Sequence, residues 1–125
     1  MATIDLSGYL RAPSTRLLDS AMGTNWHEVI LPPWCTVATI TTTASLYYAL
    51  ANGADGRTQP VASAAASGTS DKVSVAVSGT EGKFSVVMRD AEDKPGTVGV
   101  TPNRSIFLAA QSGTAAVSIE LGVGR

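Results

Sequence analysis

The feature that most limits the fold is a two-residue alternation of apolar and polar side chains from residue 26 onward. The alternation is clearest at residues 73–77 (VSVAV) and 116–121 (AVSIEL). A period of two places successive side chains on opposite faces of a strand. No stretch after residue 23 sustains the 3.6-residue period of an amphipathic helix. The sequence therefore predicts an all-β fold.

Turn signals divide this alternating region into short pieces. Glycine, asparagine and aspartate gather at residues 52–56 (NGADG), 78–82 (SGTEG) and 111–113 (QSG), and such residues favour tight turns. Strands are expected over residues 26–31, 35–43, 44–50, 57–62, 73–77, 84–88, 97–101, 105–110 and 116–121. The spacing predicts a single-domain, jelly-roll-like β-sandwich of about eight short strands. The short turn between residues 77 and 84 also predicts that the two flanking strands form a hairpin.

The first 25 residues do not share this pattern, because their apolar side chains follow no steady period. Ser14 or Thr15 is a suitable cap for a short helix over residues 15–22. One interpretation is an extended arm, residues 1–25, that lies on another molecule, with a sandwich domain over residues 26–125. The other is an N-terminal strand and a helical turn that pack on the chain's own core. Under the first interpretation the assembly-interface residues are Ile4, Leu6, Tyr9, Leu10, Leu17, Leu18 and Met22.

The low content of charge points to a surface that is partly covered by neighbours. Only 15% of the 125 residues are charged, against about 25% in an average soluble domain. The nine Lys and Arg residues are scattered and the net charge is −1. A nucleic-acid partner is therefore not expected, since it would require a basic surface.

Targeting signals are not apparent in the sequence. The N-terminus lacks an apolar run behind a basic start. No apolar run approaches the roughly 20 residues that span a bilayer. We expect a chain made in the cytoplasm, with no membrane partner, that stays there or is assembled into a particle.

Catalytic and metal-binding patterns are scarce. His27 is the only histidine and Cys35 the only cysteine, and no Gly-x-Ser-x-Gly elbow is present. Asp90, Glu92 and Asp93 form one acidic cluster, but it lacks the spacing of a calcium loop and is interpreted as a solvated loop. We therefore expect a protein that is not an enzyme and that holds no cofactor or metal.

Aromatic residues leave one binding function open. Trp34, Tyr47 and Tyr48 are candidates for a platform on which sugar rings stack, as in a carbohydrate-binding or receptor-binding module. Packing in a core or an interface is the commoner use of such side chains.

Three stretches resemble small virion proteins of tailed bacteriophages. They are W-x-x-V-x-L-P at residues 26–32, the Thr-rich strand that follows, and SIFLAAQSGTAAVSIEL at residues 105–121. The sequence is most similar in style to capsid decoration (cement) proteins of jelly-roll or related sandwich type. No individual functional residue is carried over, because the resemblance contains no fixed motif.

The resemblance implies a structural role on the surface of a phage head. Its members commonly sit as homotrimers on the capsid and bridge neighbouring subunits of the major capsid protein, often with a terminal arm. A tail or head-completion protein of the virion is the alternative from the same setting.

Overall fold

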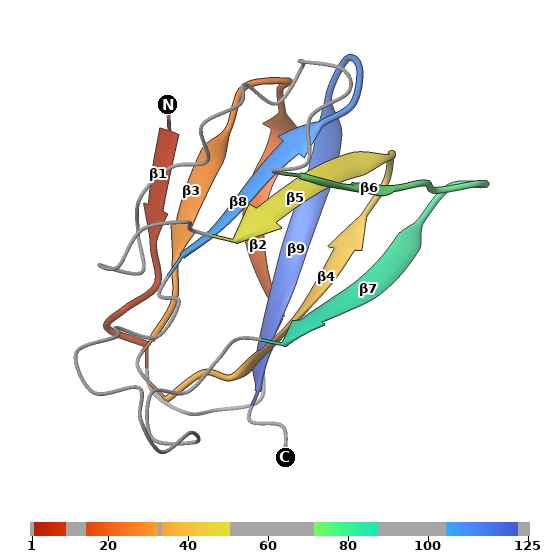
Figure 1. Ribbon diagram of the computed structural model, residues 1–125. Coiled ribbons are helices and arrows are strands. Elements are labelled where there is room, and N and C mark those ends of the chain that lie inside the picture. The colour runs from red at the N-terminus through yellow and green to blue at the C-terminus, as the bar shows by residue number, and fades with distance from the viewer. Residues whose placement is uncertain (1, 10–14, 33, 51–71, 88–104, 123–125) are drawn as a thin grey trace.

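The computed structural model describes residues 2–9, 15–32, 34–50, 72–87 and 105–122 of the chain. These residues form strands and contain no helix (Figure 1). The strands are β1 (Ala2–Asp5), β2 (Thr15–Met22), β3 (His27–Ile30), β4 (Val37–Thr42), β5 (Leu46–Leu50), β6 (Val73–Val75), β7 (Gly82–Val87), β8 (Ser105–Ala110) and β9 (Ala115–Gly122). The all-β prediction is confirmed.

Two sheets pack face to face. Sheet A has the order β1-β3-β8-β5-β6, and sheet B has the order β2-β9-β4-β7. The pairing is antiparallel except between β1 and β3, which run parallel. Along the chain, successive strands change sheet at every step but β5 to β6. Strands β2 to β9 therefore have the strand order of a jelly roll, and β1 is added at one edge.

Alternation in the sequence sets the face on which each strand buries its side chains. In β4 (VATITT), Ala38, Ile40 and Thr42 are buried and the residues between them are half-buried. In β8 (SIFLAA), all six residues are buried. A strand covered on both faces has no polar side to alternate with, and its sequence is correspondingly a nearly continuous apolar run.

The core lies between the sheets. Sheet B contributes Ile40 and Ile119, sheet A contributes Leu46 and Leu108, and all four are at most 1% exposed. At the open end of the layer, Tyr48 of β5 stacks on Phe84 of β7 with ring centroids 5.4 Å apart. Since these two strands belong to different sheets, this aromatic pair joins them directly.

The described residues before Trp26 pack on the chain's own core, as the second interpretation expected, but they form strands without the expected helical turn. Residues 15–22 are not a helix: they form β2, which pairs with β9 along the edge of sheet B. Residues 2–5 form β1, which pairs with β3. The described parts of the expected arm, residues 2–9 and 15–25, thus belong to the sandwich. β2 carries irregularities in register on both sides of Asp19, which explains why its apolar residues follow no steady period.

The expected hairpin of residues 73–77 and 84–88 is also wrong. β6 pairs with β5 in sheet A, and β7 pairs with β4 in sheet B, so the intervening turn crosses between the sheets. The crossing is tight: a Cβ atom on Gly82 would lie 2.6 Å from Cγ2 of Val77. Alternation reports which side of a strand is apolar but not which strand lies beside it, so it could not exclude the crossing.

Two residues of β2 test whether this strand belongs to the fold. Met22→Ala should lower the free energy of unfolding by about 2–5 kcal/mol, because it empties space in the core, where Met22 is 0% exposed. Leu17→Ala is the matched control, since Leu17 is 64% exposed. Urea unfolding measures both. Equal, small effects would show that β2 is not docked on the core.

Candidate functional site

The residues predicted to form an assembly interface do not form one surface. Leu6 and Met22 are buried in the core, and Ile4 and Leu18 are half-buried against it. Leu10 lies outside the described residues. Of the six members that the structure describes, Tyr9 and Leu17 are exposed, at 39% and 64%. The apolar character of the described members is therefore explained mainly by core packing, and two of these six side chains remain available to a partner.

Tyr9 lies in a small cluster at the edge of the sandwich. The guanidinium carbon of Arg16 is 3.8 Å from the centre of the Tyr9 ring. The indole Nε1–H of Trp34 donates a hydrogen bond to the backbone oxygen of Tyr9 at 3.0 Å. These contacts hold the turn after β1 against β2 and against the connection between β3 and β4, so Tyr9 is exposed yet firmly placed.

The ring nitrogens of His27 face oxygen atoms of Asn25 and Asp19 and not a nucleophilic hydroxyl group. Its Nδ1 lies 2.8 Å from the backbone oxygen of Asn25, and its Nε2 lies 3.7 Å from Oδ2 of Asp19. Oδ1 of Asp19 accepts the backbone N–H of Ala21 at 2.9 Å. Both ring nitrogens therefore face oxygen acceptors across the turn from β2 to β3. The geometry serves to fix this turn and differs from that of a catalytic triad, which needs a hydroxyl at one nitrogen.

Within the described ranges, no three His, Cys, Asp or Glu side chains converge as a metal site would require. The acidic cluster at residues 90–93 lies outside those ranges.

Cys35 is buried at 6% exposure and its thiol donates to the backbone oxygen of Val37 at 3.4 Å. Burial raises the pKa of the Cys35 thiol, and the contacts with the backbone of Gly122 and Val37 oppose this only in part.

The aromatic platform is not assembled. Tyr48 points into the core and stacks on Phe84. Tyr47, the next residue of β5, points to the opposite face of sheet A, where the amine of Lys72 lies 4.0 Å from its ring centre. Trp34 packs against the main core. Neighbouring residues of one strand cannot share a face, so the three side chains do not offer a common stacking surface.

The outer face of sheet A is buried in its middle. Trp26, Ala49, Phe107 and Ala109 form a second apolar cluster there, in which the rings of Trp26 and Phe107 meet edge to face at 6.4 Å. This cluster explains why β8 is buried on both sides.

A polar pair interrupts this second cluster. The hydroxyl of Ser105, 0% exposed, donates to Oε2 of Glu28, 5% exposed, at 2.8 Å. The two residues lie on neighbouring strands, β8 and β3. A carboxyl group without such donors would be costly to bury, so the pair is part of what lets this face be covered.

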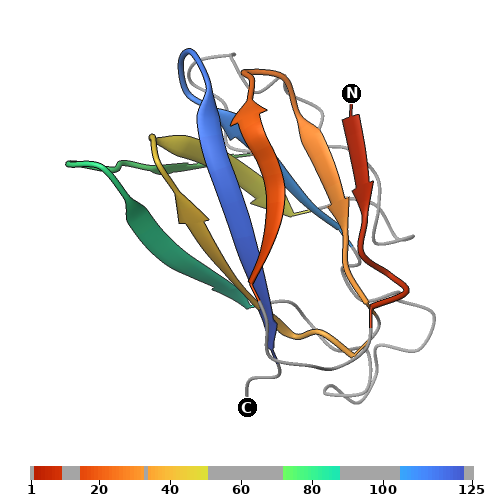
Figure 2. The ribbon, with the colours of Figure 1, turned by 180° about the vertical axis from the view of Figure 1, so that it is seen from behind.

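The outer face of sheet B is different, because it is open to solvent. Figure 2 shows β9, β4 and β7 side by side in this sheet. We call the outward side chains of these three strands the open face. Strand pairing arranges them in three rows: Gly122–Val37–Val87, Glu120–Thr39–Ser85 and Ser118–Thr41–Lys83. The β7 residues of all three rows are exposed, and Val87 reaches 72%.

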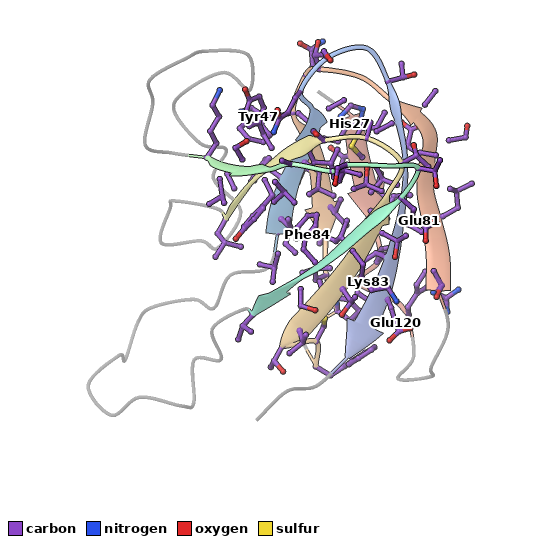
Figure 3. All side chains as sticks on the ribbon, turned by 90° about the vertical axis from the view of Figure 1, so that its right-hand side faces the viewer. His27, Tyr47, Glu81, Lys83, Phe84 and Glu120 are labelled. Carbon is purple, nitrogen blue, oxygen red and sulfur yellow. The ribbon has the colours of Figure 1, made fainter. Side chains whose placement is uncertain are left out.

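The open face carries no net charge. Lys83 and Glu120 are its two charged residues, and Figure 3 labels both on the side of the sheet away from Phe84. Its other members are small hydroxyl side chains, valines and a glycine, and the Thr39 and Ser85 hydroxyls hydrogen-bond at 3.0 Å. Sequence reasoning missed this surface. In the sequence, the outward residues of this surface are every second residue in 37–41, 83–87 and 118–122. Only strand pairing shows that these three sets of side chains lie side by side on one face.

Comparisons with known proteins add no relative. No family model, no curated protein and no solved structure matches this chain. The described part of the chain also holds no helix that is long and apolar enough to cross a membrane.

The buried polar pair predicts a specific loss of stability. Ser105→Ala should lower the free energy of unfolding by about 1–3 kcal/mol, because it removes the donor to a buried carboxyl group. Ser20→Ala, at an exposed position of β2, is the control and should change it by at most about 0.5 kcal/mol. Chemical unfolding followed by circular dichroism measures both. A neutral Ser105→Ala would mean that Glu28 does not depend on this hydroxyl.

Burial of Cys35 predicts a dependence of stability on pH. The folded state raises the pKa of the thiol, so it favours the protonated form. This contribution is complete below the ordinary thiol pKa of about 8.5 and is lost as the pH rises through the folded-state pKa. Wild type should therefore lose stability relative to Cys35→Ala at alkaline pH, measured by urea unfolding across a pH series. A difference that does not vary with pH would contradict the prediction.

Proposed function

We propose that this chain is a non-enzymatic structural virion protein, a decoration or cement protein of a phage head. In this role it oligomerises on the capsid surface and stabilises the head by bridging subunits of the major capsid protein. The location is the capsid surface of the virion, after synthesis in the host cytoplasm. The trimeric state belongs to the same proposal.

The observation that carries the proposal is the contrast between the two outer faces of the jelly roll. The outer face of sheet A is apolar and buried in its middle, whereas the open face of sheet B is solvent-exposed along β7 and carries one lysine and one glutamate that balance. Over the whole chain only 15% of residues are charged, and free monomers commonly keep a more highly charged surface for solubility. A sheet face of threonine, serine and valine suits a module that spends its working life against other proteins.

Contact with the capsid is assigned to the edge of the sandwich that carries Tyr9 and Leu17. These are the exposed members of the predicted interface. Tyr9 is held in place by Arg16 and Trp34, so little side-chain freedom is lost when it is buried. Burying a side chain of the size of Leu17 contributes about 1.5–3 kcal/mol. When linked copies bind many sites on one head, the high effective concentration strengthens the overall binding beyond that of a single contact.

Purified particles provide the test. Mass spectrometry of virions from the source should detect this chain, and heads stripped of it should regain heat stability when the purified chain is added back. Tyr9→Ala with Leu17→Ser should weaken head binding. Val73→Ser is the matched control, because Val73 is also exposed, at 47%, but lies on β6 of sheet A.

Two results would overturn the proposal. One is the absence of the chain from purified particles. The other is head stability that does not change when the chain is added. Presence in tails but not in heads would instead identify a tail protein.

A further inference from the structure

The three rows of the open face share a regularity in side-chain size. In each row the β4 residue in the centre has a short neighbour on one side and a long one on the other. In the first row Gly122 of β9 is short and Val87 of β7 is long. In the next row the order is reversed, with Glu120 long and Ser85 short. In the third row Ser118 is short and Lys83 is long.

This regularity makes the face complementary to itself. A twofold axis parallel to β4 would place β9 of one copy over β7 of the other, while β4 faces β4. Val87 would then lie over the partner's Gly122, Glu120 over Ser85, and Lys83 over Ser118. Every long side chain meets a short one, as close packing of two sheet faces requires.

The two charges fit the same arrangement. Within one chain Lys83 and Glu120 lie on strands separated by β4 and in adjacent rows, so they are more than two strand spacings of about 4.8 Å apart. In the paired copies Glu120 of one lies over Ser85 of the other, and Ser85 is two residues from Lys83 on the same strand. Stacked sheets lie about 10 Å apart, and a lysine and a glutamate side chain that extend toward each other can span this gap. The axis therefore generates two opposite-charge contacts and no like-charge contact.

We infer that the open face is a homodimer interface, in which a second copy of this chain packs on sheet B about a twofold axis along β4. The occupant is a second copy because both the size pattern and the charges of the face are satisfied by that face itself. Three strands make a small interface, so the dimer is weak in solution and is favoured where copies are concentrated. The inference does not rest on the proposed capsid role, and failure to bind heads would leave it intact.

Charge reversal tests the pairing. Sedimentation velocity of the full chain, from micromolar to millimolar concentration, should show a monomer–dimer equilibrium. Glu120→Lys and Lys83→Glu should each weaken the dimer by about tenfold or more, because each replaces two attractive contacts by repulsive ones. The double reversal E120K/K83E should restore it. Glu81→Lys is the matched control, because Glu81 is an exposed glutamate in the turn before β7, outside the three rows (Figure 3).

A second variant addresses shape without changing charge. Within the monomer, a Cβ atom on Gly122 would meet only the backbone oxygen of Val37, at an ordinary 3.8 Å. Gly122→Val should therefore keep the thermal unfolding of the monomer while it abolishes the dimer, because the partner's Val87 needs that space.

The possible results divide clearly. A dimer that weakens with Glu120→Lys and Gly122→Val, ignores Glu81→Lys and returns with the double reversal supports the inference. A chain that is only monomeric or only trimeric over the whole concentration range overturns it. A dimer that none of these substitutions affects also overturns it, because its interface would lie elsewhere.

Discussion

Burial of β8 on both of its faces is the constraint on which the rest of the structure depends. On one side Ile106 and Leu108 join the layer between the sheets, and on the other Phe107 and Ala109 join Trp26 in the second cluster. A strand of this kind must lie inside its sheet, with β3 and β5 as neighbours. Once β8 is central in sheet A, β9 passes to sheet B and packs between β2 and β4. The jelly roll is thus organised around one short apolar segment.

The same burial makes the two outer faces unequal, and this inequality is the basis of the functional proposals. The outer face of sheet A holds the Glu28–Ser105 hydrogen bond in an apolar setting, where a lone carboxyl group would be unstable. The outer face of sheet B is exposed along β7, and its one lysine and one glutamate balance in charge. The rest of its three rows consists of hydroxyl side chains, valines and a glycine.

The sequence predicted a strand correctly where the spacing of its apolar residues was enough to identify it. The strands at residues 37–42, 46–50 and 105–110 were predicted because their alternation or continuous apolar character is undisturbed. β2 was taken for a helix because the irregularities around Asp19 shift its side chains out of phase. The same irregular spacing led to the choice of Met22 and Leu6 as interface residues, although both pack in the core. Tyr47 and Tyr48 looked like one platform because adjacency in sequence hides their opposite directions.

The sequence by itself determined that the chain is built of strands, which side of most strands is apolar, and that charge is scarce. These properties are local: they follow from the order of side chains along a pleated backbone. Only the tertiary structure decided that β6 and β7 belong to different sheets, that residues 15–22 complete sheet B, and that the polar halves of β4, β7 and β9 form one face. The reason is that strand pairing joins residues distant in the chain, and period-two sequences are compatible with many pairings. The choice among them is made by how well two complete sheets pack on a shared core.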